Sequence, residues 1–113
     1  MNIQIFGKRK SFDTKKAERW FQERGIRFQS IDLVQYGMSR GEFESVKHAV
    51  GSLDALIDSK AKGAGTLQYL AYETDKEDKL LEEPALFAAP IVRNGKRATV
   101  GYQPEIWQGW LKE

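Results

Sequence analysis

The chain opens with Ile3-Gln4-Ile5-Phe6, continues through Gly7-Lys8-Arg9-Lys10-Ser11-Phe12-Asp13-Thr14, and then runs from Lys15 to Arg24. The first four residues predict a short buried strand, because three of them are large and apolar. The next eight predict a basic turn, and the last ten predict a helix with Ala17, Trp20 and Phe21 on one face. Gly25 follows as the expected end of that helix.

Ser11 lies where the turn enters the helix. Backbone N–H groups without partners and the helix dipole stabilise an anion there, and they lower the pKa of a thiol placed at such a position. The chain contains no cysteine. A serine hydroxyl does not ionise near neutral pH without an adjacent base, and the only histidine, His48, belongs to a distant predicted helix. The turn therefore has the frame of a thiol site without its nucleophile.

The composition bounds the class of protein. The 113 residues are enough for one domain, spanning residues 1–113, and the 41% hydrophobic content indicates a globular fold. A net charge of +2 does not imply direct nucleic-acid binding. The absence of cysteine and the single histidine exclude a disulfide scaffold and Cys or His metal sites, so no metal is expected. With no leader and no apolar run of membrane length, we expect a soluble, cytoplasmic monomer.

Further elements follow along the chain. Residues 26–33 alternate well enough for a second strand, which makes the start a parallel crossover unit. Ser39-Arg40-Gly41-Glu42 is a capping box that begins a helix, and Thr74-Asp75-Lys76-Glu77 has the form of a second one. Residues 89–100 predict a hairpin with a type I′ turn at Asn94-Gly95. Pro104 begins a last helix.

Four aromatic residues outside the turn are expected to serve structure. Trp107 and Trp110 are predicted to anchor the last helix in the core. Tyr69 and Tyr72 lie three residues apart and are predicted to pack together. His48 is predicted to lie on a helix surface.

The order β-α-β, helices, β-β, α is that of the thioredoxin fold, and several motifs resemble the arsenate-reductase-like (ArsC) family, which includes the Spx transcription regulators. The matching stretches are Ile5-Phe6-Gly7, Ser11-Phe12-Asp13-Thr14-Lys15-Lys16-Ala17, Gly25-Ile26-Arg27-Phe28, Ile31-Asp32-Leu33, Pro90-Ile91-Val92-Arg93-Asn94-Gly95 and Val100-Gly101-Tyr102. They span essentially the whole chain. The chain looks most similar to a subgroup with a single redox residue followed by Phe-Asp-Thr, some of whose members carry selenocysteine.

The resemblance implies an α/β, thioredoxin-like fold with a four-stranded mixed sheet, flanking helices and a helical insertion over roughly residues 39–83. It also implies that Pro90 is cis and faces the nucleophile position, with backbone exposed for a bound peptide or thiol. Ser11 then stands at the nucleophile and Thr14 at the second redox position, where its hydroxyl would donate to a thiolate. The residues expected to bind substrate or partner are Lys8, Lys10, Phe12, Lys15, Ala89 and Pro90.

Two departures disfavour arsenate as substrate. The arginines with which the family's reductases hold an oxyanion are not evident, and Ala89 precedes the loop proline where an arginine would be expected. After the second long helix the chain offers Asp54 and Asp58, and a carboxylate beside an arsenate is repulsive.

Two function classes remain open. One is a thiol- or selenol-dependent oxidoreductase, with no bound cofactor and with glutathione or a thioredoxin- or glutaredoxin-type thiol as co-substrate. The other is a non-catalytic module of the Spx type, whose relatives contact RNA polymerase. Ser11 itself has three interpretations: natural loss of the nucleophile, an engineered replacement of cysteine, or a replacement of selenocysteine.

Overall fold

The computed structural model describes residues 1–113 and contains one four-stranded sheet in the order β2-β1-β3-β4. The strands are β1 (Ile3–Gly7), β2 (Phe28–Asp32), β3 (Ile91–Asn94) and β4 (Arg97–Val100). β1 pairs parallel with β2 and antiparallel with β3, and β3 pairs antiparallel with β4. The N-terminal strand thus lies inside a mixed sheet, and the predicted thioredoxin-like fold is confirmed.

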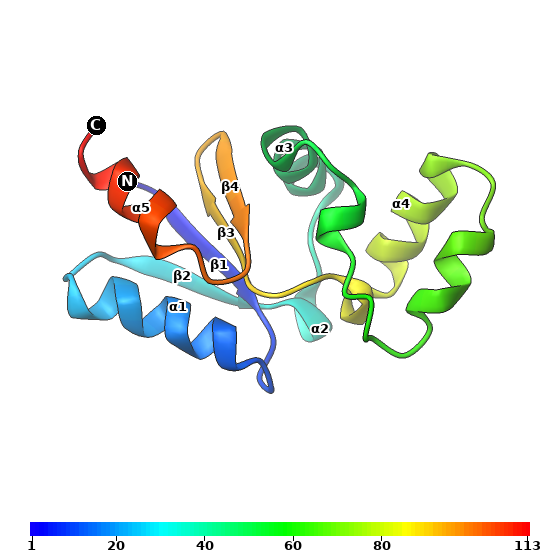
Figure 1. Ribbon diagram of the computed structural model, residues 1–113, viewed down its shortest axis with the longest axis horizontal. Coiled ribbons are helices and arrows are strands. Elements are labelled where there is room, and N and C mark those ends of the chain that lie inside the picture. The colour runs from blue at the N-terminus through cyan, green and yellow to red at the C-terminus, as the bar shows by residue number, and fades with distance from the viewer.

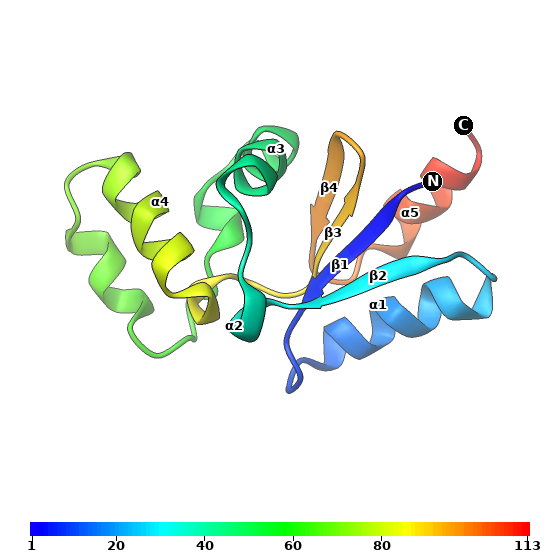
Figure 2. The ribbon, with the colours of Figure 1, turned by 180° about the vertical axis from the view of Figure 1, so that it is seen from behind.

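Helices cover both faces of this sheet. They are α1 (Phe12–Glu23), α2 (Leu33–Tyr36), α3 (Arg40–Val50), α4 (Glu73–Glu82), α5 (Pro104–Leu111) and the 3-10 turns η1 (Asp54–Leu56), η2 (Ala64–Tyr69) and η3 (Pro84–Leu86). Figure 1 shows α1 and α5 on one side of the sheet and α3 on the other, with α4 in a lobe beyond α3. Figure 2 shows the same layers from behind. The helical insertion is therefore present as predicted.

One core joins α1 and α5 to the sheet. Ile3, Ile5 and Val92 point to this face, as the period of two along a strand requires. The ring of Trp107 lies 5.1 Å from that of Phe21, and its Nε1 donates a hydrogen bond of 2.8 Å to Thr99 Oγ1. The buried indole thus has its polar atom satisfied. The prediction that Trp107 and Trp110 belong to the core is confirmed.

A second, larger core joins the opposite face to the insertion. Phe6 and Ile91 of the sheet belong to a cluster of thirteen buried residues, which also includes Phe43 and Val46 of α3 and Leu80 of α4. Helix α3 begins with the predicted capping box: Glu42 N donates to Ser39 Oγ at 3.1 Å, and Ser39 N donates to Glu42 Oε1 at 2.9 Å.

The second predicted capping box is wrong. Helix α4 begins at Glu73 after Tyr72, and no side chain caps it. The carboxylate of Glu77 is buried and forms an ion pair with Lys47 of α3, so it is not available to return to the helix start. The prediction that Tyr69 and Tyr72 pack is also wrong, because their side chains are 81% and 70% exposed.

The hairpin forms where predicted, but its turn is of another type. Asn94 pairs with Arg97, so Gly95 and Lys96 are the two turn residues. Gly95 has φ of +60° and no residue other than glycine has positive φ. A type I′ turn needs positive φ at both central residues, whereas type II′ needs it only at the first, which is glycine here. Asn94 is held in the strand, where its Oδ1 accepts from Asn2 N.

No helix of the protein combines the length and the apolar character that a membrane crossing requires.

The Lys47–Glu77 ion pair predicts how stability changes at alkaline pH. The hydrogen bond to Glu77 raises the pKa of Lys47 above 10.5, against an opposing effect of burial. A raised folded-state pKa contributes stability that is complete below the unfolded pKa and disappears as the pH rises through the folded one. We expect the stability difference between the wild type and Lys47→Met to be constant up to about pH 10 and to shrink above it.

Urea unfolding followed by tryptophan fluorescence at several alkaline pH values measures this difference. Lys62→Met, at an exposed lysine that is in no ion pair, is the control and should give a small, pH-independent difference. A Lys47→Met difference that stays constant through the alkaline range would contradict the assignment.

Candidate functional site

Ser11 is the N-cap of helix α1. Its backbone is extended (φ −86°, ψ 116°), and its Oγ accepts a hydrogen bond of 3.0 Å from the N–H of Thr14. The turn before it is closed by Ser11 N, which donates to Lys8 O at 3.1 Å. Because Ser11 caps the helix, α1 begins at Phe12 and not at Lys15 as the apolar spacing predicted. The side chain at position 11 therefore binds a backbone N–H of the first helical turn, which has no acceptor within the helix.

The loop before β3 faces this helix start. The Ala89–Pro90 bond is cis, as predicted, and Pro90 is buried with its carbonyl accepting from Gly101 N at 2.8 Å. Ala89 is half-buried, and no hydrogen bond within the protein uses its N–H or its carbonyl. Ser11 and Ala89 line one cavity of about 610 Å³, which we call the cis-proline cavity. Residue 11 and an unpaired stretch of backbone thus share one open space.

Phe12 and Lys10 stand at the rim of the cis-proline cavity. The ring of Phe12 is 78% exposed, although it immediately follows the capping residue. Lys10 is exposed and is in no ion pair. The cavity therefore has an apolar and a cationic group at its entrance.

Lys8 has a different environment from the one expected of a substrate-binding residue. Its Nζ donates to Ala85 O at 2.8 Å and lies 3.4 Å from Asp58 Oδ2, and its side chain is only 17% exposed. Asp58 belongs to the insertion, and Ala85 belongs to η3, which directly follows it. Lys8 therefore fastens the β1–α1 turn to the insertion, and its charge is compensated by Asp58.

Thr14 also differs from expectation. It is 6% exposed, and its Oγ1 accepts from Lys8 N at 3.3 Å. The side chain packs so closely on Gly7 that a Cβ there would lie 2.2 Å from Thr14 Cγ2. The hydrogen bond to position 11 comes from the backbone N–H of Thr14, while its side chain lines a second cavity together with Lys15.

The charges of the cis-proline cavity are mixed. Once Lys8 and Asp58 are paired, Lys10, Lys60 and Asp13 remain on its lining, and no arginine lines it. Arg93 lies elsewhere, with its guanidinium donating to Gln4 Oε1 at 2.8 Å and to Ser45 Oγ at 3.4 Å. The cavity therefore has no guanidinium to hold an oxyanion bidentately.

The sequence interpretation missed the contribution of Lys60. It lies about fifty residues beyond Ser11 in a loop, and only the folding of the insertion brings it to the cavity. Asp54 does not line this cavity, and His48 is exposed on α3 as predicted. No three His, Cys, Asp or Glu side chains come together in an arrangement that would hold a metal ion.

Comparison with known proteins agrees with this architecture. A family model described as the ArsC family matches residues 6–110. The global transcriptional regulator Spx 2 of Oceanobacillus iheyensis is 28% identical over 110 residues, which cover 93% of this chain and 80% of the relative.

Solved structures of low identity share the fold. An ArsC family related protein from Bacteroides fragilis is 17% identical with a TM-score of 0.84, covering 96% of this chain and 97% of its own. An arsenate reductase from Vibrio cholerae is 21% identical with a TM-score of 0.83 and the same coverage.

Loss of the Ser11 cap should destabilise the protein. Ser11→Ala removes the acceptor of the Thr14 N–H, and we expect the free energy of unfolding to fall by about 1 kcal/mol. Ser59→Ala, at an exposed serine whose side chain forms no hydrogen bond, should change it by less than about 0.5 kcal/mol. Urea unfolding of both variants is the measurement, and equal losses would argue against the cap.

Proposed function

The chain belongs to the ArsC family, and on this premise we propose that it has the scaffold of a thiol-dependent oxidoreductase whose nucleophile position is residue 11. With Ser11 in that position the chain is inactive as a reductase, because serine supplies no thiolate. The observation that carries the proposal is the shared cavity: the residue 11 side chain, held by the Thr14 N–H, opens onto the same space as the unpaired backbone of Ala89.

The expected substrate is a sulfur-containing peptide or protein, with glutathione or a thioredoxin- or glutaredoxin-type thiol as reductant. An extended segment bound beside Ala89 gains two main-chain hydrogen bonds from its free N–H and carbonyl. The exposed ring of Phe12 offers such a segment an apolar contact. Arsenate is a poor substrate for this cavity, because no arginine lines it to hold an oxyanion bidentately and the carboxylate of Asp13 is on its lining.

A chain with a thiol at position 11 can carry out thiol–disulfide exchange without a bound cofactor. Its thiolate attacks one sulfur of a partner disulfide, a new S–S bond forms to the enzyme, and the other sulfur leaves as a thiolate that takes a proton from water. A glutathione-type thiolate then attacks the substrate sulfur of this mixed disulfide. The second step restores the thiolate at position 11 and releases the substrate as a disulfide with the reductant.

The three interpretations of Ser11 predict different codons at position 11 of the native gene. A cysteine codon or an in-frame UGA at position 11 of the native gene supports the enzyme, and a serine codon supports natural loss. The contact that the structure shows is between Ser11 Oγ and Thr14 N, and it favours neither cysteine nor selenocysteine as the original residue.

Restoring the thiol is the direct test. In Ser11→Cys we expect a thiol pKa well below the unperturbed value of about 8.5, because the Thr14 N–H and Lys10 stabilise the thiolate. Asp13 opposes them, but its side chain is exposed and screened by water. The measurement is the pH dependence of alkylation by iodoacetamide, with the new cysteine as the only thiol in the chain.

Ser59→Cys is the matched control and should titrate near about 8.5, since its side chain is exposed and forms no hydrogen bond. The Ser11→Cys protein should also reduce a glutathione mixed disulfide, and the Ser11 chain should not. Equal thiol pKa values in Ser11→Cys and Ser59→Cys would contradict the proposal that residue 11 is the nucleophile position. Equal turnover by the Ser11→Cys protein and the Ser11 chain would contradict it as well.

The similarity to Spx 2 favours a second candidate function, a non-catalytic module that binds another protein. The family resemblance points to RNA polymerase as that partner. In this case the Ser11 chain should bind purified bacterial RNA polymerase saturably in surface plasmon resonance, with unchanged affinity in Ser11→Cys. Absence of binding by both proteins would eliminate RNA polymerase as the partner.

A further inference from the structure

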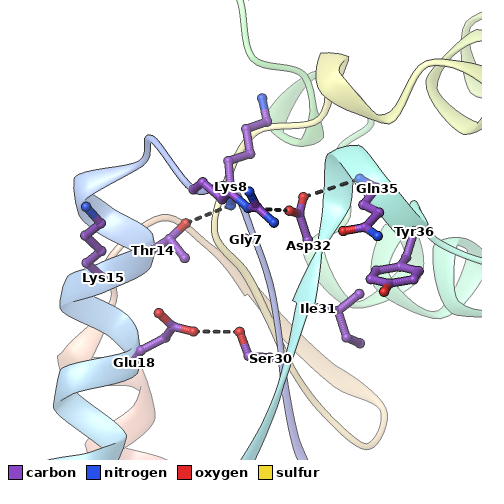
Figure 3. Close-up of a pocket in the computed structure, with 11 residues that line it drawn as sticks. Gly7, Lys8, Thr14, Lys15, Glu18, Ser30, Ile31, Asp32, Gln35 and Tyr36 are labelled. Carbon is purple, nitrogen blue, oxygen red and sulfur yellow. Dashed lines mark hydrogen bonds and ion pairs between the residues drawn. The ribbon is translucent and has the colours of Figure 1, made fainter.

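A second cavity, which we call the α1–β2 cavity, opens on the other side of the β1–α1 turn. It has a volume of about 400 Å³ and lies between α1, the end of β2 and α2. Figure 3 shows Thr14 and Glu18 projecting from α1 toward β2, with Tyr36 at the opposite wall. Of the side chains that line the cis-proline cavity, only Lys8 also belongs to this one, so the two spaces are separate sites.

The α1–β2 cavity contains a buried donor without an acceptor. The Thr14 side chain is 6% exposed, and its hydroxyl oxygen accepts from Lys8 N. No hydrogen bond in the protein uses the proton of that hydroxyl. The hydroxyl has one partner and still has a proton to donate, so the site is suited to a ligand that brings an acceptor oxygen to Thr14.

Most charges around the cavity are already paired. The Arg9 side chain lies 3.4 Å from Asp32, whose other oxygen accepts from the N–H groups of Val34 and Gln35. Lys8 directs its ammonium to Asp58 and away from this cavity. Asp32 and Arg9 therefore leave little net charge for a ligand.

Two opposite charges remain for a ligand. Lys15 is in no ion pair. Glu18 is half-buried and uses only Oε2, which accepts from Ser30 Oγ at 2.6 Å, so its Oε1 has no partner. Although Lys15 and Glu18 are three residues apart on α1, they do not pair with each other, because Glu18 turns to Ser30 across the cavity.

We propose that the α1–β2 cavity binds a small zwitterion of the α-amino acid type. Its carboxylate accepts from the Thr14 hydroxyl and faces Lys15, and its ammonium donates to Glu18 Oε1. The volume is within the range of small-molecule sites and exceeds the needs of a free amino acid. A phosphate is a poor alternative, because its second negative charge would face the half-buried carboxylate of Glu18.

Titration of the ¹⁵N-labelled protein with four probes, followed by NMR, tests both halves of the site. L-alanine carries both charges, acetate only the carboxylate, ethylamine only the ammonium, and phosphate is the competing anion. We expect saturable shifts of the Thr14, Glu18 and Ser30 amides with L-alanine, and affinities weaker by about tenfold or more with the other three probes.

Variants decide whether the named groups bind. Thr14→Val and Glu18→Gln should each weaken L-alanine binding by about tenfold, and Thr14→Ser should restore it because the hydroxyl returns. Lys16→Met and Glu23→Gln, at exposed α1 positions that do not line the cavity, are the controls and should bind as the wild type does. The NMR spectrum of each variant also reports whether it is folded.

Three results would overturn the proposal: shifts with L-alanine that do not saturate by about 100 mM, unchanged binding by folded Glu18→Gln, or tighter binding of phosphate than of L-alanine. None of these results affects the Ser11→Cys alkylation test, because that test measures the pKa of a thiol in the cis-proline cavity.

Discussion

The contact between Thr14 and Gly7 is the constraint on which both cavities depend. Glycine lets the first turn of α1 lie directly on the end of β1, where a Cβ would be 2.2 Å from the threonine methyl. This approach buries the Thr14 side chain and leaves its backbone N–H for the side chain at position 11. One residue thus serves two sites: its amide binds the side chain of Ser11, which lines the cis-proline cavity, and its own side chain lines the α1–β2 cavity.

The insertion contributes to the site through Lys8. The ammonium of Lys8 contacts Asp58 of the insertion and Ala85 of η3, so this lysine holds the turn against both segments and loses most of its exposure. A basic turn in the sequence is therefore less cationic in the folded protein than its composition indicates. Lys10 and Lys60 supply the positive charge that remains at the cis-proline cavity.

Two helix starts with the same sequence signature show what local patterns predict. Ser39 and Glu42 form a reciprocal capping box, because both side chains are free to return to the backbone. Thr74 and Glu77 have the same spacing, but Lys47 of the neighbouring helix binds Glu77 and the helix begins at Glu73. The hairpin is a second example. The Asn94-Gly95 pair correctly predicts a turn in this stretch, but Asn94 pairs with Arg97, so the two central turn residues are Gly95 and Lys96.

By itself the sequence determined the strand–turn–helix unit, the place of Ser11 where the turn enters the helix, the cis-proline loop and the family. These features depend on hydrogen bonds between residues a few positions apart, or on motifs that are visible in the order of residues. Only the tertiary structure decided that Lys8 forms an ion pair, that Lys60 lines the site and that the Thr14 side chain lines a second cavity. Those outcomes rest on contacts such as Lys8 with Asp58 and Ala85, which lie 50 and 77 residues apart in sequence, and no local pattern encodes such pairings.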